Sequence, residues 1–251
     1  MTEGQAQSPP HDLTAYPEVL VLLWPDSFGV NVLPASSGVA GMGRQLLQDD
    51  LMPVPGRPGR VHGKRVAAHI FALALLRMHD LDLIALRPET KKVLFIKKTQ
   101  VVAVRGSSGG DTQGLSAVSL GHFKPGESSL TVRELIRRWF RDLTPVPFLH
   151  VIGDTEETAE RLGLYRKVTG SNTAIRAAKR VAHVVAGGSF IYEPVEDLVV
   201  RTQEAASRLA DRWRQFGSDD PELREHLLKD VEGAIESMEL PEPPEPPESS
   251  N

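Results

Sequence analysis

A run of apolar residues between positions 64 and 79 constrains the fold more than any other feature of the sequence. The spacing predicts a helix whose apolar side chains lie almost all round it, at Val66, Ala67, Ile70, Phe71, Leu73, Ala74, Leu75 and Leu76. A helix that is apolar on every side is stable in water only when other elements cover it. We therefore expect residues 64–79 to form the central buried helix of the fold.

This segment is too short to cross a membrane. Its strongly apolar part spans residues 66–76 and contains His69, whereas a membrane-spanning helix needs about 20 apolar residues. The N-terminus "MTEGQAQSPPHDLTAYP" also lacks the basic and apolar regions of a secretory signal. Any membrane contact is therefore expected to be peripheral.

Two apolar runs precede the central helix in "EVLVLLWPDSFGVNVLP", residues 18–34. The residues between them, Pro25, Asp26, Ser27 and Gly29, are typical of a tight turn and favour a hairpin. Residues 18–24 fit a short buried helix equally well. Further along, we expect a short helix around residues 45–51 and a loop over "PVPGRPGRVHG", residues 53–63.

The segment after the central helix predicts a hairpin. "LIAL" and "VLFI" are short apolar runs on either side of "RPETKK", in which Pro88 occupies a turn position. We expect these two runs to pair, and "VVAV", residues 101–104, to add a third strand. Helix, strand, turn and strand in this order form a winged-helix-like unit.

A capped helix is predicted over residues 131–143, "TVRELIRRWFRDL". Thr131 and Glu134 form a capping box, and Leu130 and Leu135 occupy the positions of a hydrophobic staple. One face of this helix is apolar, and the other is basic, with Arg133, Arg137, Arg138 and Arg141.

A second winged-helix-like unit is predicted to follow. "PFLHVIG" favours a strand, and Asp154 with Glu157 is expected to cap the next helix, which ends at Gly163 before a strand in "LYRKV". The last third is expected to be helical, over residues 174–186, 194–216 and 221–238, and Asp220 and Pro221 are expected to open the last of these helices, with Pro221 in its first turn. The second of these helices carries a stripe at three- and four-residue spacing, formed by Leu198, Thr202, Ala205, Leu209, Trp213 and Phe216.

These elements predict a mainly α, α+β fold: a helical domain with short β-hairpins and two winged-helix-like units. Residues 17–238 are expected to form a single globular domain, with hairpins and helices over 17–168 and a helical part over 169–238. Residues 1–16 and 239–251 contain too few apolar side chains to offset the entropy of ordering the chain. Both ends are therefore expected to be disordered.

Charge and composition restrict the function. The chain of 251 residues has 29 Lys and Arg and 33 Asp and Glu, but Glu239, Glu242, Glu245 and Glu248 lie in a C-terminal tail without basic residues. The rest is therefore neutral, which argues against nucleic-acid binding by bulk charge. Because cysteine is absent, disulfides and thiolate chemistry are excluded, which fits a cytoplasmic protein.

No catalytic signature is found. The eight histidines form no metal-binding motif, and neither "SSGGD" nor "AGGSF" matches a serine nucleophile elbow. "RGSSGGDTQG" lacks the ending of a phosphate-binding loop. We expect no enzymatic activity, no cofactor and no metal; an unfamiliar enzyme site around His150, Asp154 and Arg161 is the third alternative.

Two basic surfaces remain as candidate sites. The first is the predicted hairpin, where apolar residues lie among basic ones, as in an interfacial membrane element; its residues are Arg87, Lys91, Lys92, Phe95, Ile96, Lys97, Lys98 and Arg105. A core strand with solvated lysines fits this stretch equally well. The second is the arginine face of the capped helix. A solvated face is the favoured interpretation there, because Glu134 can pair with Arg138 four residues later.

The order of these features resembles one known family. Similar segments are "YPEVLVLLWPDSFG", "AAHIFALALLRMHDLDLIAL", "KKVLFIKKTQVVAVRGSSGGD", "SSLTVRELIRRWF" and "AERLGLYRKV". Over residues 17–168 the chain resembles the Golgi phosphoprotein 3 family, peripheral membrane proteins with bacterial members. The resemblance implies a mainly helical fold, no enzymatic activity, binding of phosphoinositide or other anionic lipid, and membrane insertion of the hairpin.

The sequence thus predicts a non-enzymatic peripheral membrane or adaptor protein, cytoplasmic and associated with an anionic membrane surface or a protein partner. The alternative is a winged-helix-like nucleic-acid-binding regulator, in which a helix enters a groove and a basic hairpin contacts the backbone.

Overall fold

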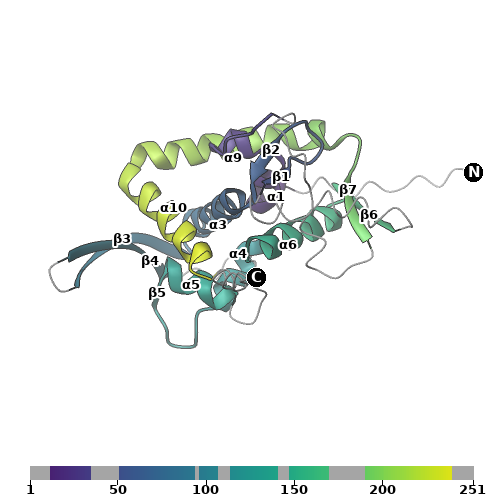
Figure 1. Ribbon diagram of the computed structural model, residues 1–251. Coiled ribbons are helices and arrows are strands. Elements are labelled where there is room, and N and C mark those ends of the chain that lie inside the picture. Colours follow the sequence, from purple (N-terminus) through teal and green to yellow (C-terminus); the bar gives the residue numbers. More distant parts are fainter. Residues whose placement is uncertain are drawn as a thin grey trace, which may run out of the picture.

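A computed structural model of the chain describes residues 12–34, 51–93, 96–106, 114–140, 147–169 and 190–238. These residues form a mixed α+β fold that is mostly helical, with small antiparallel sheets (Figure 1). No helix in these ranges is long and apolar enough to cross a membrane. The elements are η1 (Leu13–Ala15), α1 (Pro17–Leu23), η2 (Pro25–Phe28), β1 (Leu51–Pro53), β2 (Arg60–His62), α3 (Gly63–Asp80), β3 (Ile84–Val93), β4 (Ile96–Arg105), α4 (Gly114–Gly121), β5 (Ser129–Thr131), α5 (Val132–Trp139), α6 (Pro147–Arg161), β6 (Tyr165–Thr169), β7 (Phe190–Pro194), α9 (Leu198–Asp219) and α10 (Pro221–Glu236).

Helix α3 confirms the predicted central helix. Its side chains are buried almost without interruption from Val66 to Met78, and it contacts α1, α4, α6 and α10. His69 lies among these residues, with its Nδ1 2.9 Å from the Arg65 carbonyl oxygen. Burial lowers the pKa of His69, so this histidine is a neutral core residue near pH 7.

The N-terminal apolar run is a helix, so the predicted hairpin over residues 18–34 is wrong and the alternative of a short buried helix is confirmed. Pro17 occupies the first turn of α1, where a backbone N–H has no partner within the helix, so its absence loses no helical hydrogen bond. Every residue of α1 is buried. A helix covered on all sides has the same continuous apolar pattern as a buried strand, which is why the sequence left both open. Before α1, the short helix η1 (Leu13–Ala15) is capped by Asp12, whose side chain accepts a hydrogen bond from the Thr14 N–H (3.1 Å).

The central hairpin is longer than predicted. Strand β3 continues through "RPETKK" and pairs with β4 from Ile84 opposite Arg105 to Val93 opposite Ile96. The predicted turn at Pro88 and the pairing of "LIAL" with "VLFI" are therefore wrong. "VVAV" belongs to β4, and the third strand is β5.

Pro88 is tolerated inside β3 for two reasons. The sheet order is β3-β4-β5, which leaves β3 at an edge of the sheet. Opposite Pro88, the Val101 N–H donates to Asp230 and not across the ladder. Pro88 therefore occupies a non-hydrogen-bonded pair, where a strand residue needs no N–H toward its neighbour.

Two further predictions are corrected. "PFLHVIG" forms the first half of α6, and Asp154 lies inside this helix, not at its cap. The buried residues Phe148, Val151, Ile152 and Thr155 follow the spacing of a helix on both sides of Gly153. The strand prediction did not take this helical spacing into account. Part of the predicted loop at 53–63 forms a hairpin of β1 and β2.

Several predictions are confirmed. The Thr131 hydroxyl accepts a hydrogen bond from the Glu134 N–H (3.1 Å), and Asp220 accepts one from the Leu223 N–H (2.9 Å) at the start of α10. All six stripe residues of α9 are buried. Gly163, with φ of 65°, follows α6, and "LYRKV" contributes to β6. The helix predicted over 174–186 and most of that over 45–51 lie outside the described residues.

Candidate functional site

The distal half of the β3–β4 hairpin extends away from the helices (Figure 1). We call residues 88–93 and 96–101 the lysine arm. Burial changes sharply along β4: Val101 is 0% exposed, whereas Lys97 and Lys98 are exposed. Lys91 and Lys92 on β3 are exposed as well. The lysines of the predicted hairpin site therefore project from the body and do not pack inside it.

A buried carboxylate anchors the arm where it leaves the body. Asp230 of α10, 3% exposed, accepts hydrogen bonds from the Val101 N–H (2.6 Å) and from Arg133 Nε of α5 (2.8 Å). Strand β5 pairs only with residues 102–104 of β4. At Val101, the next position along β4, the backbone N–H donates to Asp230 and not to β5. A Cβ on Gly233 would lie 2.8 Å from Arg133 Nη2, so the missing side chain makes room for this arginine.

The register of the arm brings like charges together. Lys91 lies directly opposite Lys98, and Lys92 directly opposite Lys97. Directly opposed like charges destabilise an antiparallel pair. Glu89 lies 3.5 Å from the Lys91 ammonium and offsets part of this repulsion. Local rules of this kind are broken mainly at functional sites, which makes the two lysine pairs the strongest candidate.

The four ammonium groups are distributed over both faces of the arm. Because side chains alternate along a strand, Lys92 and Lys97 share one face with the hydrogen-bonded pair Thr90 and Thr99 (3.0 Å). Lys91 and Lys98 share the opposite face. The arm can therefore present positive charge in two directions.

The other predicted hairpin residues are spread out. Arg87 is exposed, four residues before Lys91. Arg105 is at the root of β4, seven residues from Lys98, which corresponds to roughly 24 Å along a strand. The structure therefore does not bring Arg105 into the lysine cluster. Ile96 begins β4, and Phe95 lies outside the described residues.

The second predicted basic surface is largely used within the protein. Arg133 pairs with Asp230, and Arg138 pairs with Glu127 (2.5 Å) and with Glu134 (3.2 Å). The predicted pairing of Glu134 with Arg138 is thus confirmed. Arg137 is exposed and donates to the Ser237 hydroxyl (3.4 Å), while Arg141 lies outside the described residues. This face therefore offers much less available charge than the arm.

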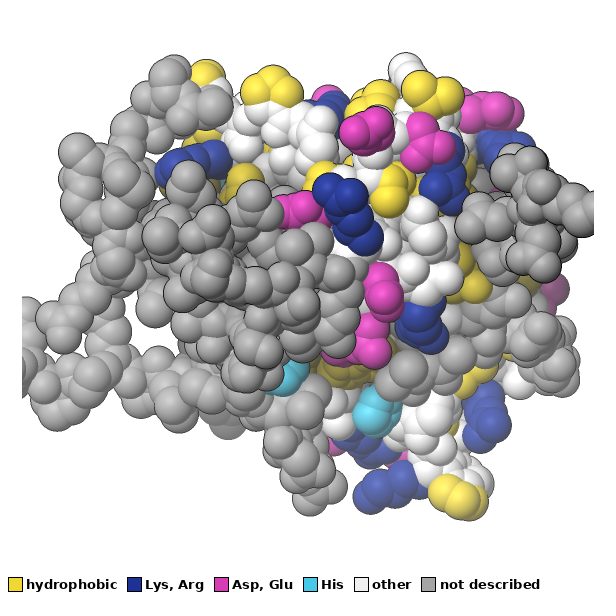
Figure 2. Space-filling model, turned by 90° about the vertical axis from the view of Figure 1, so that its right-hand side faces the viewer, with side chains coloured by type: hydrophobic (Ala, Val, Ile, Leu, Met, Phe, Trp, Pro, Cys, Tyr) yellow, Lys and Arg dark blue, Asp and Glu magenta, His cyan; other side chains and the backbone are white. Residues whose placement is uncertain are grey.

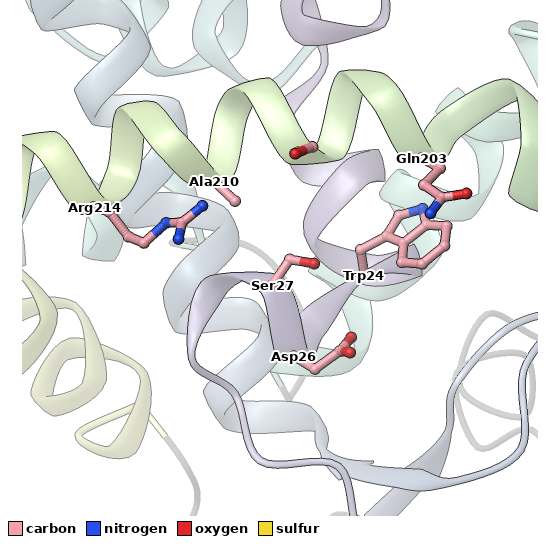
Figure 3. A pocket seen from close by; sticks show the side chains of 7 residues that line it. Trp24, Asp26, Ser27, Gln203, Ala210 and Arg214 are labelled. Atoms are coloured by element: carbon pink, nitrogen blue, oxygen red, sulfur yellow. The ribbon is translucent and has the colours of Figure 1, made fainter.

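A polar pocket of about 400 Å³ lies between η2 and α9 (Figure 3). Arg57 lies over the Trp24 ring (4.4 Å) and pairs with Asp26 (2.5 Å), and its hydrogen bond lowers the pKa of Asp26. Trp24 Nε1 donates to the Thr202 hydroxyl (2.8 Å). The lining residues are Trp24, Asp26, Ser27, Gln203, Ser207, Ala210 and Arg214. This set offers hydrogen bonds but no histidine to activate a serine nucleophile.

No family model, no curated protein and no solved structure matches this chain. At the end of the molecule opposite to the arm, acidic and basic side chains are intermingled (Figure 2). A surface of mixed sign contrasts with the arm, which has four lysines and one acidic residue, Glu89.

Sequence reasoning missed Asp230. The signal was present, because Leu223, Leu227, Asp230, Val231 and Ala234 occupy one face of the last helix at three- and four-residue spacing. A charged residue in an apolar stripe predicts a buried partner. The sequence could not identify Arg133 and Val101 as those partners, because both lie about 100 or more residues away.

Proposed function

We propose that this protein is a non-enzymatic peripheral membrane or adaptor protein that binds anionic lipid headgroups through the lysine arm. The observation that carries the proposal is that Lys91 lies directly opposite Lys98, and Lys92 directly opposite Lys97, on a projecting hairpin. Their mutual repulsion is relieved when an anionic partner binds. An anionic surface supplies such charge at many points at once, which suits four lysines distributed over two faces.

The magnitude of the attraction favours a membrane. Each lysine near an anionic bilayer contributes about 1 kcal/mol, so four lysines contribute roughly 4 kcal/mol, or about a thousandfold in partitioning. The sequence at the turn, Leu94 and Phe95 between Val93 and Ile96, is apolar. Lysines have long stems that let their charges remain in the headgroup region while neighbouring apolar residues enter more deeply.

The order of elements supports the finer fold proposal of two winged-helix-like units. Helix α3 is followed by the hairpin of β3 and β4, and α6 is followed by the strand pair β6 and β7. This order, and a lysine-bearing hairpin after a buried helix, also agree with a relationship to the Golgi phosphoprotein 3 family, which we retain as a proposal. The absence of cysteine supports a cytoplasmic location.

The nucleic-acid alternative has less support. A winged-helix regulator inserts a helix into the major groove, but α3 is buried from Val66 to Met78. On α6, Asp154 and Glu157 are exposed, and these carboxylates would repel a phosphate backbone. The arm alone could contact a nucleic acid, which makes duplex DNA a useful competitor in the experiment below.

Co-sedimentation with vesicles tests the proposal. The wild-type protein should bind vesicles containing phosphatidylserine, with an affinity that falls as salt rises, and should not bind neutral vesicles. Changing Lys91, Lys92, Lys97 and Lys98 to glutamate should reduce binding at least a hundredfold. A matched control reverses the same number of exposed charges on the body, at Arg65, Lys124, Arg208 and Lys229.

The control variant should keep most of its binding. Equal losses in the two variants would mean that net charge and not the arm determines binding, and would overturn the proposal. Tighter binding to duplex DNA than to the vesicles at equal salt would favour the alternative.

A further inference from the structure

The C-terminal tail is the most acidic segment of the chain. The sequence "ELPEPPEPPESSN" (residues 239–251) has four glutamates and no basic residue, and it lies outside the described residues. The glutamates recur at every third position, Glu239, Glu242, Glu245 and Glu248. Three residues is also the repeat of the polyproline II helix, which proline-rich sequences favour. In that conformation, the four carboxylates lie along one edge, about 9 Å apart.

The tail begins next to positive charge. Met238, the last described residue, packs against the main hydrophobic core, so the origin of the tail is fixed. Ser237 is hydrogen-bonded to Arg137 of α5. Arg137 is exposed, and it forms no ion pair within the part of the chain that the structure describes. Arg137 therefore places a positive charge beside the point where the tail begins.

The arm is within reach of the tail. The bond between Asp230 and Val101 joins α10 to the arm. From Asp230 to Met238 the helix advances about 12 Å, and from Val101 to Lys97 the strand advances about 14 Å. If these two segments run in opposite directions from the bond, Met238 and Lys97 are roughly 30 Å apart. Ten extended residues span about 33 Å, so Glu248 can reach the arm.

We infer that the acidic tail is an intramolecular ligand of the lysine arm, and that it competes there with anionic surfaces. The tail carries carboxylates and the arm carries ammonium groups, so the two are complementary in charge. Because the tail is tethered by a short segment, its effective concentration at the arm is in the millimolar range. Exposed ion pairs are individually weak and sensitive to salt. A membrane that presents many anionic groups at once can therefore displace the tail. The competition rests on the proposed function, whereas the contact between tail and arm does not.

Carbodiimide cross-linking of the full chain tests the contact directly, because the reagent joins a carboxylate to an ammonium group only when the two are paired. Mass spectrometry should find peptides that join Glu239, Glu242, Glu245 or Glu248 to lysines of the arm. Mixing chains of two isotopic compositions separates links within one chain from links between chains. The links should disappear in about 0.5 M salt, because salt at this concentration screens exposed ion pairs.

Lys124 and Lys229 provide the internal control, since both are exposed on the body. Links from the tail to these two lysines as frequent as links to the arm, or an absence of links to the arm, would overturn the inference. A variant with Glu239, Glu242, Glu245 and Glu248 changed to glutamine should lose the links, because carbodiimide does not activate an amide, and circular dichroism should show that its fold is unchanged.

Vesicle binding then separates the two proposals. The four-glutamine variant should bind phosphatidylserine vesicles about tenfold more tightly than the wild type at low salt. If arm links form but neither protein binds vesicles, the lipid proposal fails and the tail contact stands. If the wild type binds vesicles, no arm links form and the variant binds equally well, the tail inference fails and the lipid proposal stands.

Discussion

Among single residues, Glu18 has the most unusual environment. It is 2% exposed, its Oε1 accepts a hydrogen bond from the Leu115 N–H (3.2 Å), and its Oε2 has no hydrogen-bond partner among the described residues. Burial raises the pKa of Glu18 to about 7, although the hydrogen bonds and the charges of Arg77 and Arg161 act in the opposite direction. Gly114 leaves space for this carboxyl, because a Cβ there would clash with Oε1.

The pKa of Glu18 predicts a pH dependence of stability. The unfolded carboxyl titrates near 4.5 and the folded one near 7, so its contribution is fully present below pH 4.5 and is lost as the pH rises through 7. Glu18→Gln keeps an oxygen for Leu115 but cannot ionise. We expect the variant to match the wild type at pH 4.5 and to be more stable at pH 8, on the order of 3 kcal/mol.

Denaturant unfolding at several pH values measures this difference. A stability gap between Glu18→Gln and the wild type that is the same at pH 4.5 and pH 8 would show that the carboxyl does not titrate in this range. Glu89→Gln is a matched control, because Glu89 is exposed on the arm and should give no comparable trend.

Among the elements, the β3–β4 hairpin shows why local signals misplaced a turn. Pro88 and the charged residues of "RPETKK" are typical of a turn, so the prediction followed the local preferences of these residues correctly. The strand continues because β3 is at the sheet edge and Asp230 satisfies the N–H opposite Pro88. The second condition depends on α10, far away in the sequence. The capped helices α5 and α10 were predictable, since their caps and stripes lie within a few residues.

The arm should be dispensable for folding. Glu89 and Gln100 form a hydrogen-bonded pair, because hydrogen-bonded and non-hydrogen-bonded pairs alternate outward from Pro88 and Val101. A two-residue Asn-Gly turn can therefore replace residues 90–99. We expect this shortened protein to unfold within about 1 kcal/mol of the wild type, since exposed residues are removed, and to lose vesicle binding.

A control for this experiment places Asn-Gly at positions 94 and 95 and keeps the lysines. It should bind vesicles more weakly than the wild type but more strongly than the shortened protein, because only the apolar part of the turn is changed. A loss of more than about 3 kcal/mol in the shortened protein would mean that the arm supports the body, and would contradict its assignment as a projecting device.

At the scale of the whole molecule, the four glutamates of the tail account for the net charge of -4, and the arm is a local excess of positive charge. Residues 1–238 carry equal numbers of basic and acidic side chains, and the described residues on the face opposite to the arm are of mixed sign (Figure 2). Lysines are hydrated point charges and do not match the shape of one headgroup. We therefore expect vesicle binding to follow surface charge density more than headgroup identity.

Vesicles of phosphatidylserine and of a phosphoinositide, prepared at equal surface charge, test this expectation. The affinities should agree within about threefold, as expected when binding depends on surface potential. A preference of more than about thirtyfold for one headgroup would indicate a shaped site elsewhere on the molecule, and the arm would then account for only part of the binding.

The sequence by itself determined the central helix, the caps of α5 and α10, the buried stripe of α9 and the location of the lysines. These features depend on residues within one or two turns of each other, so local physical chemistry is sufficient. Tertiary structure decided whether residues 18–24 and 147–153 became helices, where the hairpin turns, and which arginines of α5 remain available. It also decided that the lysines project, because Asp230, Arg133 and Val101 meet only in the folded chain.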